Sequence, residues 1–444
     1  MDKLVVEGGN YLRGSLPVGG SKNTALPLMA ASLLGGGSCT LTNIPNLKDV
    51  TTFAHVLRVA GAKVQFDPDT NELDVDASTV DYPEAPYDLV KKMRASFYML
   101  GALLGRVGKA RVSMPGGCSW GPRPVDLHIK GVKEFGASVE LDQGYVIAEA
   151  PNGRLPGGSF KMEPSSVGAT INLLLAAVRA KGGSRIENAA QEPDVVVFGE
   201  ALKAMGAKIE GLGTETIEIE GVDVLDSVDF RNSADRIELG TYMILAAMAG
   251  EPGDTVRLNG AGTKFLGNAF RDVFRETGAD FTSEGEGADS YVEIAVPDEL
   301  KPVSITTAPY PGFPTDLQAQ WTVLLSQTRG EATVKETIYK DRFRHIPELR
   351  RMGLMALQGD GQVDVYGNAE LKGATVMSTD LRASVSLVMA GIVAEGRTDV
   401  LRVYHLDRGY EELEHKLSDA GIDIRREEYD PQEAEPQRAA ELPT

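Results

Sequence analysis

The chain has 444 residues, 42% of them hydrophobic and 25% charged, and its formal net charge is −19. This length exceeds one compact core and predicts two domains of roughly 200 residues each. The negative charge excludes non-specific binding to nucleic acid or to anionic membranes, and no apolar run approaches the roughly 20 residues that span a bilayer. With no secretory signal pattern at its start and only two cysteines, the sequence predicts a cytoplasmic protein.

One pattern recurs six times, at a spacing of roughly 70 residues, which indicates a repeat architecture. In four copies a helix-like segment ends at a glycine, and a small residue and a strand-like segment follow, as in RVAGAKVQF at Gly61; the copies at Gly353 and Gly421 are weaker. Glycine just past a helix end is a common left-handed cap. The other copies are centred on Gly136, Gly206, Gly278, Gly353 and Gly421.

Another helix-length segment precedes each of these glycines and is apolar almost all round, which predicts a helix buried on every side. The segments are Thr24–Leu34, Ala95–Leu104, Ala169–Val178, Leu239–Ala249, Gln318–Leu325 and Ala383–Val393. The helices that end at the repeated glycines are more amphipathic, as Val50–Ala60 shows. Three such units in each domain would place the apolar helices inside and the strands outside.

Cations stand at the starts of several predicted helices. Ser, Thr and Asp at these starts are ordinary N-caps, but Lys22, Arg94 and Arg382 oppose the helix dipole by roughly 0.3–1 kcal/mol. A bound anion would reverse that cost, because free N–H groups at a helix start attract negative charge. The loop between strand and amphipathic helix carries further charges: Asp49, Arg123, Arg342 and Arg408.

A single arginine in such a loop is readily explained as a solvated charge. Recurrence at equivalent repeat positions instead favours side chains that project towards the same end of each domain. The pattern therefore predicts a cationic site between two domains, suited to a ligand with several negative charges.

Two residues are candidates for proton transfer. Cys118 lies in PGGCSWGPRP, five residues before Arg123, where a cation would favour the reactive thiolate; an ordinary surface turn is the alternative. Asp316 follows three prolines and begins an apolar helix. It is either a plain N-cap or a carboxylate held ionised among cations, able to take a proton from a substrate hydroxyl. No metal-ligand spacing or dinucleotide fingerprint is found, so neither a metal nor a cofactor is expected.

The chain resembles the enolpyruvyl transferases in a series of motifs that extends to its acidic end: GGSKNTALPL, PGGCSWGPRPVDLH, RNSADRIELGTY, PYPGFPTDLQAQ, DRFRHIPELRRMG and LDRGYEELEHKL. The cysteine loop is similar to the branch that acts on UDP-N-acetylglucosamine. The resemblance implies a two-domain inside-out α/β barrel of six repeated units. One domain would span residues 22–232, with the Cys118 lid loop, and the other residues 1–21 with 233–426. Residues 427–444 are expected to form a disordered acidic tail.

The resemblance implies transfer of enolpyruvate from phosphoenolpyruvate to the 3′-hydroxyl of UDP-N-acetylglucosamine, with release of phosphate, as the first committed step of peptidoglycan synthesis. Two alternatives stay open: the sister branch that acts on shikimate 3-phosphate, and an inactive paralogue that binds nucleotide sugars. Only these small molecules are expected as partners, with no nucleic acid and no membrane.

Site residues follow from the resemblance by position. Phosphoenolpyruvate would contact Lys22, Asn23, Arg123, Arg342, Arg382 and Arg408. The nucleotide sugar would contact Arg94, Arg123, Pro124, Val125, Asp126, Leu127, Ser165, Ser166, Gly168, Asp316 and Ile338. The catalytic set would be Cys118, Asp316, Lys22 and Arg408. Asp316 would act as base, and Cys118 would donate a proton or assist product release and be alkylated by fosfomycin.

Overall fold

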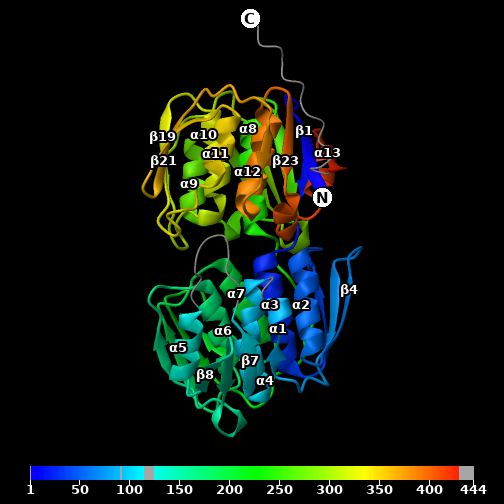
Figure 1. The fold of residues 1–444 in the computed structure, drawn as a ribbon, viewed down its shortest axis with the longest axis vertical. Helices are drawn as coiled ribbons and strands as arrows, with labels where there is room; N and C mark the ends of the chain where they lie inside the picture. Colours follow the sequence, from blue (N-terminus) through cyan, green and yellow to red (C-terminus); the bar gives the residue numbers. More distant parts are fainter. Residues whose placement is uncertain (1, 91–92, 115–124, 430–444) are drawn as a thin grey trace, which may run out of the picture.

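The computed structural model describes residues 2–90, 93–114 and 125–429 and divides them between two lobes, the lower and the upper in Figure 1. The lower lobe has a hydrophobic core drawn from residues 25–225. The core of the upper lobe combines residues 4–18 with residues 237–424. Among the described residues, no helix combines the length and the apolarity that spanning a membrane requires.

In the described part of the chain, six four-stranded sheets, three in each lobe, confirm the six predicted repeats. In the third unit the strand order is β10-β11-β13-β12, with β10 parallel to β11 and the other pairs antiparallel. Its elements in chain order are β10 (Ser159–Lys161), α6 (Val167–Ala177), β11 (Gly183–Glu187), α7 (Pro193–Ala204), β12 (Lys208–Glu210) and β13 (Thr216–Glu220).

The other two units of the lower lobe repeat this order of strands and helices. The first consists of β14 (Phe230–Arg231), α1 (Lys22–Gly35), β3 (Ser38–Thr42), α2 (Lys48–Val59), β4 (Lys63–Asp67) and β5 (Glu72–Asp76). The second consists of β6 (Glu84–Ala85), α3 (Tyr87–Val90), the 3-10 helix η1 (Arg94–Tyr98), α4 (Met99–Val107), β7 (Lys109–Ser113), α5 (Asp126–Glu134), β8 (Ser138–Asp142) and β9 (Tyr145–Glu149), and η2 (Pro151–Gly153) follows it.

The upper lobe holds the remaining three units. The fourth contains β2 (Ser15–Pro17), α8 (Arg236–Ala249), β15 (Thr255–Asn259), η3 (Thr263–Phe265), α9 (Asn268–Glu276), β16 (Asp280–Glu284), η4 (Gly287–Asp289) and β17 (Tyr291–Ala295). The fifth contains β18 (Ile305–Thr306), η5 (Thr315–Leu317), α10 (Gln318–Ser326), β19 (Glu331–Lys335), α11 (His345–Arg351), β20 (Met355–Gly359) and β21 (Gln362–Tyr366). The sixth contains β22 (Thr375–Met377), α12 (Leu381–Val393), β23 (Arg397–Leu401), η6 (Val403–Arg408), α13 (Leu413–Asp419), β24 (Asp423–Glu428) and β1 (Asp2–Glu7).

Within the described residues, the chain passes between the lobes twice. Strand β1 lies between β23 and β24 in the sixth sheet, so the chain begins in the upper lobe and then enters the lower one. Strand β14 pairs with β3 before the chain returns. The two crossing segments are joined by a bridge between Gly20 and Ala234.

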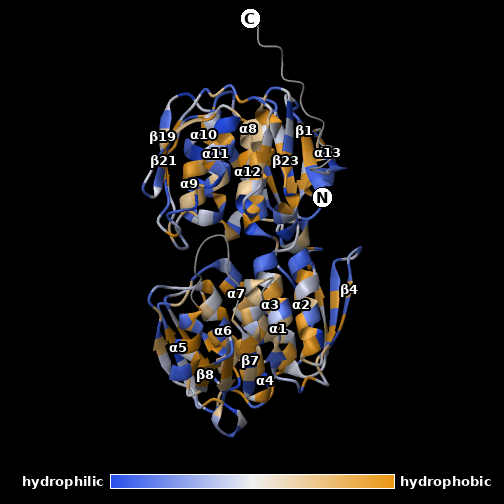
Figure 2. Cartoon of the chain, viewed as in Figure 1, coloured by the Kyte–Doolittle hydropathy of each residue, from blue (hydrophilic) through white to orange (hydrophobic). Residues whose placement is uncertain are grey.

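The apolar helices lie inside the lobes, as their sequences predict. Every residue from 169 to 177 of α6 is buried, and Figure 2 shows hydrophobic stretches along the central helices of both lobes. Glycine brings α4 against α6 at Gly101, where a Cβ atom would lie 2.1 Å from the backbone oxygen of Asn172. The helix pair can therefore approach this closely only with glycine at that position.

The predicted helix Ala95–Leu104 is wrong in its first half, where the chain forms η1 before α4 begins. In a continuous α-helix the amide of Gly101 would bond the carbonyl of Phe97. Asn172 of α6 separates the two groups: its Oδ1 accepts from the Gly101 amide and its Nδ2 donates to the Phe97 oxygen, at 2.5 and 2.9 Å. A side chain 71 residues away thus changes the local helix type.

The expected tail begins later than residue 427. Strand β24 continues to Glu428 and pairs with β1 along its length. Backbone pairing with β1 extends the strand, and Glu427 also lies 3.4 Å from the ammonium of Lys3, its partner in that register. Residues 430–444 of the expected tail lie outside the described residues.

Candidate active site

The site is built at the boundary of the two lobes, where hydrophilic ribbon replaces hydrophobic ribbon in Figure 2. Lys22 is the first residue of α1 and Asn23 the second, and both are half-buried. Arg382 lies in the first turn of α12, whose N-cap Asp380 accepts from two backbone amides. Helix starts from both lobes therefore carry cations to the same boundary.

Asp49 joins cations from the two lobes. In the lower lobe, the Lys22 ammonium lies 3.2 Å from its carboxylate. From the upper lobe, Arg408 donates to both of its oxygens at 3.1 and 3.3 Å. Burial lowers the pKa of Lys22; Asp49 raises it, but the charges of Arg382 and Arg408 lower it again, and the net shift is downward. Three cations thus act on one another within one site.

A second carboxylate, Asp316 in η5, is paired with two arginines. The Arg342 guanidinium lies 2.6 Å from one of its oxygens, and the Arg382 guanidinium lies 3.5 Å from the other. Burial raises the pKa of Asp316, but Arg342 and Arg382 outweigh this effect and hold that pKa below its ordinary value. The Asp316 carboxyl is therefore ionised at neutral pH.

Arg382 is itself held from within the upper lobe. Its side chain is 5% exposed and donates to the Tyr410 hydroxyl at 3.2 Å. That hydroxyl in turn lies 2.9 Å from the Thr241 hydroxyl. These contacts fix the guanidinium at the lobe boundary, where it reaches Asp316.

Asp194 forms a second link between the lobes. It lies at the start of α7, and its carboxylate is 2.9 Å from the Arg236 guanidinium at the start of α8. The hydroxyls of Ser21 and Thr24 donate to the same carboxylate at 3.3 Å each. Arg236 also contributes to the lowered pKa of Asp316. The start of α1 is thereby connected to the upper lobe.

The predicted nucleotide-sugar residues are distributed over both lobes. Val125 and Leu127 are buried and Asp126 half-buried at the start of α5, where Lys130 pairs with Asp126 at 3.1 Å. Ser165, Ser166 and Gly168 are half-buried at the start of the neighbouring helix α6. Ile338 belongs to the upper lobe, in the segment that follows β19. Of the remaining residues predicted for the site, Cys118, Arg123, Pro124 and the side chain of Arg94 lie outside the described part of the structure.

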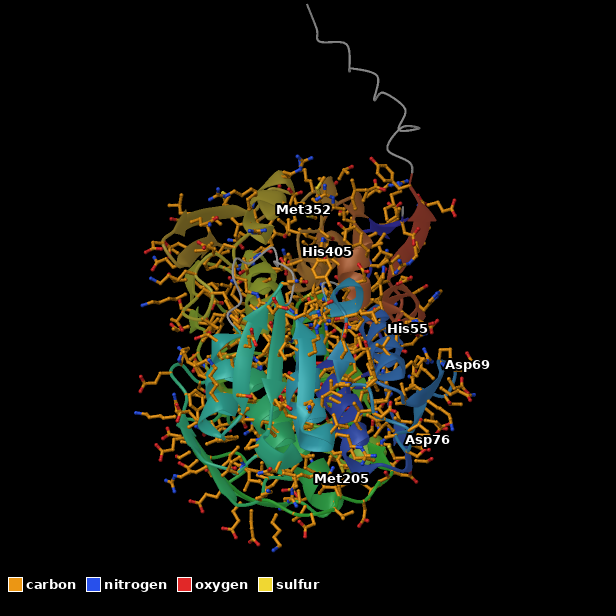
Figure 3. The ribbon with its side chains drawn as sticks, turned by 60° about the horizontal axis from the view of Figure 1, so that its bottom comes forward. His55, Asp69, Asp76, Met205, Met352 and His405 are labelled. Carbon is orange, nitrogen blue, oxygen red and sulfur yellow. The ribbon has the colours of Figure 1, made fainter. Side chains whose placement is uncertain are left out.

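The histidines lie on separate elements. His55 belongs to α2 and His405 to η6, and the two labelled side chains lie apart in Figure 3. Across residues 2–90, 93–114 and 125–429, His, Cys, Asp and Glu side chains form no group of three suited to hold a metal ion. The other cysteine, Cys39, is buried in β3, and burial raises the pKa of its thiol to about 11, so the thiol stays protonated.

Sequence reasoning predicted Asp316 but missed the other two carboxylates that hold the cations. It noted Asp49 only as one charge of the repeated loop, and it passed over Asp194. A chemical argument could have predicted these carboxylates, because buried cations that gather at one boundary require counter-ions. It also left Arg236 out of the site, although this residue begins a buried helix as Lys22 does.

Comparison with known proteins gives consistent matches over nearly the whole chain. The family described as EPSP synthase (3-phosphoshikimate 1-carboxyvinyltransferase) matches residues 6–417. A relative from Chlorobaculum parvum named UDP-N-acetylglucosamine 1-carboxyvinyltransferase is 49% identical over 97% of this chain and 99% of its own length. A relative of the same name from Myxococcus xanthus is 48% identical over 96% of this chain and 100% of its own length.

Solved structures are similar to the chain in fold. The enolpyruvyl transferase NikO from Streptomyces tendae aligns with a TM-score of 0.85 and 28% identity over 96% of this chain and 98% of its own. EPSP synthase from Acinetobacter baumannii aligns with a TM-score of 0.77 and 17% identity over 96% of this chain and 100% of its own. At that identity the second likeness concerns the fold alone.

Proposed function

The chain belongs to the EPSP synthase family, and from this premise we propose that it transfers enolpyruvate from phosphoenolpyruvate to the 3′-hydroxyl of UDP-N-acetylglucosamine. One observation carries the proposal: relatives 48–49% identical along almost their entire length share the name UDP-N-acetylglucosamine 1-carboxyvinyltransferase. The shikimate alternative has in its favour the description of the family model, which covers the whole family, and structural likeness to an EPSP synthase at 17% identity. An inactive paralogue is disfavoured, because the lobe boundary keeps the acidic residues Asp49 and Asp316 together with the cations that pair with them.

The cation cluster suits phosphoenolpyruvate, which carries a phosphate and a carboxylate. In this proposal Lys22 and Arg408, which share Asp49, hold the phosphate together with Arg123. Arg342 and Arg382, which share Asp316, hold the carboxylate, and Asn23 orients the reacting groups. Fixed cations stabilise negative charge on a departing phosphate without having to reorganise during the reaction.

The reaction proceeds by addition and elimination. Asp316 accepts the proton of the sugar hydroxyl while that oxygen bonds to C2 of phosphoenolpyruvate, and C3 gains a proton from Cys118. The resulting adduct then loses one proton from C3, the bond between C2 and the phosphate oxygen breaks, and the enol ether and phosphate are formed. A positioned base and acid each contribute about 10²–10⁴-fold to such a rate.

Asp316 becomes a stronger base when the donor binds. Paired with Arg342 and Arg382, its carboxylate has a pKa below the ordinary value and holds protons weakly. A substrate carboxylate that binds these two guanidiniums offsets the positive charge that lowers this pKa. Binding of phosphoenolpyruvate would therefore raise the basicity of Asp316 at the moment a proton must be removed.

The nucleotide sugar is proposed to lie along the starts of α5 and α6. The residues proposed to contact it are Arg94, Arg123, Pro124, Val125, Asp126, Leu127, Ser165, Ser166, Gly168, Asp316 and Ile338. The two hydrophobic cores support a division into residues 22–232 and residues 1–21 with 233–426. We place the activity in the cytoplasm, at the entry to peptidoglycan synthesis.

A phosphate-release assay with each acceptor tests the proposed function. The purified protein and phosphoenolpyruvate should release phosphate with UDP-N-acetylglucosamine and not with shikimate 3-phosphate. Release only with the shikimate compound would assign the chain to the sister activity. Binding of the nucleotide sugar without any turnover would instead support the inactive paralogue.

A further inference from the structure

Glu336 is a buried carboxylate that sequence analysis did not single out. It is the first residue after β19 and is 2% exposed. It accepts four hydrogen bonds from the described residues. Its Oε1 accepts from the Thr307 hydroxyl at 2.8 Å, the Ile338 amide at 2.7 Å and the Tyr339 amide at 3.0 Å, and its Oε2 accepts from the Thr315 hydroxyl at 2.7 Å.

The Oε2 contact leads directly to the reacting groups. Because Thr315 donates its hydroxyl proton to Glu336, its oxygen is free to accept a hydrogen bond from the Arg342 guanidinium, at 2.9 Å. Another nitrogen of the same guanidinium lies 2.6 Å from Asp316. Glu336 therefore sets the donor and acceptor directions in a chain of contacts, called the relay below, that runs through Thr315 to Arg342 and Asp316.

The Oε1 contacts hold the backbone at the start of the segment that carries Arg342. Ile338 and Tyr339 follow Glu336 directly, and their amides point at its carboxylate. Thr307 also accepts from the Thr337 amide at 2.9 Å, so the strand end and the next segment are fixed together. One carboxylate thus anchors both the backbone of this segment and the side chain of its arginine.

The surroundings of Glu336 are suited to a buried carboxylate, because four neutral groups donate hydrogen bonds to it. Charge removed from water is costly unless hydrogen bonds replace the lost solvation. Here two hydroxyls and two backbone amides supply them. Hydrogen bonds to an ionised acceptor are stronger than those between neutral groups, so the carboxylate restrains its donors more tightly than an amide oxygen would.

We propose that Glu336 is a positioning residue that aligns Arg342 with the carboxylate of phosphoenolpyruvate and, through Thr315, sets the geometry of Asp316. The inference rests on the proposed function and names a residue that acts without touching substrate. Its two oxygens have separable duties: Oε2 serves the donor substrate, and Oε1 serves the segment that contains Ile338.

Glu336→Gln separates these duties, because its amide keeps one acceptor oxygen for the Oε1 contacts and turns an NH₂ group towards Thr315. Thr315 can no longer donate there, so its hydroxyl reorients and the relay to Arg342 changes. We expect KM for phosphoenolpyruvate to rise about tenfold, equivalent to about 1.4 kcal/mol. The KM for UDP-N-acetylglucosamine should change less than about twofold, equivalent to about 0.4 kcal/mol.

Two further sets of variants serve as controls. Glu331→Gln makes the same change at the exposed start of β19 and should leave both KM values unchanged. Thr315→Val removes the hydroxyl that links Glu336 to Arg342 and should raise KM for phosphoenolpyruvate as Glu336→Gln does. Thr315→Ser keeps a hydroxyl there, so its KM should stay close to that of the wild type. In the combined Glu336→Gln and Thr315→Val variant the two effects should not add.

A rise in both KM values by the same factor, or additive effects in the combined variant, would overturn the inference and leave a purely structural role. A substrate-free measurement keeps this test apart from that of the proposed function. The denaturation midpoint of a Glu336→Gln and Arg342→Met double variant should shift by less than the sum of the single shifts. Additive shifts would refute the relay, whether or not the wild type transfers enolpyruvate.

Discussion

Asp49 and Asp316 show how single carboxylates organise a cationic site. Each pairs with two cations, Asp49 with Lys22 and Arg408 and Asp316 with Arg342 and Arg382. A donor with two anionic groups would replace both carboxylates as the partner of those cations. The sequence predicted the cations because they recur at equivalent repeat positions, but a carboxylate at a helix start cannot be told from an ordinary N-cap.

Replacing Asp316 with Asn should abolish most turnover. The amide cannot accept a proton, so kcat should fall about 10²–10⁴-fold, while calorimetry should give nearly unchanged affinity for UDP-N-acetylglucosamine. Asp289→Asn, an exposed aspartate in η4, is the matched control. Weakened nucleotide-sugar binding with normal turnover at saturation would contradict the base role.

His345 should make stability depend on pH. Burial, with a smaller effect of the Arg342 charge, lowers the pKa of His345 to about 3. In the unfolded chain the pKa is about 6.5, so only the unfolded state binds a proton between these values. The free energy of unfolding should therefore fall as pH decreases below about 6.5, by about 2 kcal/mol at pH 5.

Urea denaturation at pH 7, 6 and 5 measures this slope. Because a phenylalanine cannot titrate, His345→Phe should lack the His345 share of the slope, whatever its effect on stability at pH 7. His55→Phe makes the same change at an exposed histidine on α2 and is the matched control. A slope for His345→Phe equal to that of the wild type would show that His345 binds a proton as readily in the folded as in the unfolded state.

At the scale of elements, the sequence predicted the buried helices because apolarity around a whole helix leaves no side to face water. It could not predict that η1 interrupts the second of them. That change depends on Asn172, which inserts its amide between Phe97 and Gly101 from another helix. Local sequence specifies the periodicity of an element, whereas contacts between residues far apart in the sequence, such as Asn172 with Gly101, form only when the helices pack.

Gly101→Ala should destabilise the lower lobe. Its methyl group would meet the Asn172 backbone oxygen at 2.1 Å and its side-chain oxygen at 2.3 Å, so α4 and α6 would have to move apart. Overpacking of this kind costs about 1–3 kcal/mol, which thermal or urea denaturation would detect. Gly183→Ala is the control, because its nearest contact is 3.8 Å away. An unchanged midpoint for Gly101→Ala would contradict the described helix approach.

At the scale of the whole molecule, two ion pairs among the described residues join the lobes: Asp49 with Arg408 and Asp194 with Arg236. The repeats predicted that cations from both halves meet, since equivalent positions project to equivalent ends. The pairing of each cation across the boundary depends on how the lobes are set against each other. No single-repeat pattern contains that information.

Removing both bridging carboxylates should loosen the ligand-free protein. In an Asp49→Asn and Asp194→Asn variant, cations of both lobes face one another without their counter-ions, so the lobes should separate. Small-angle X-ray scattering should then give a larger radius of gyration than for the wild type. Asp76→Asn breaks a surface pair with Lys63 inside one sheet and should leave the radius unchanged. A radius equal to that of the wild type in the double variant would show that other contacts hold the lobes together.

The placement of β1 between β23 and β24 has a consequence for biosynthesis. Strand β1 is synthesised before both of its neighbours and has no partner strand until the sixth unit emerges, about 20–80 s later at ordinary elongation rates. The lower lobe, by contrast, is built from one contiguous stretch and can fold while translation continues. A nascent chain should thus carry a folded lower lobe while β1 is still unpaired, so the edges of β1 stay open to other partners until the sixth unit has been made.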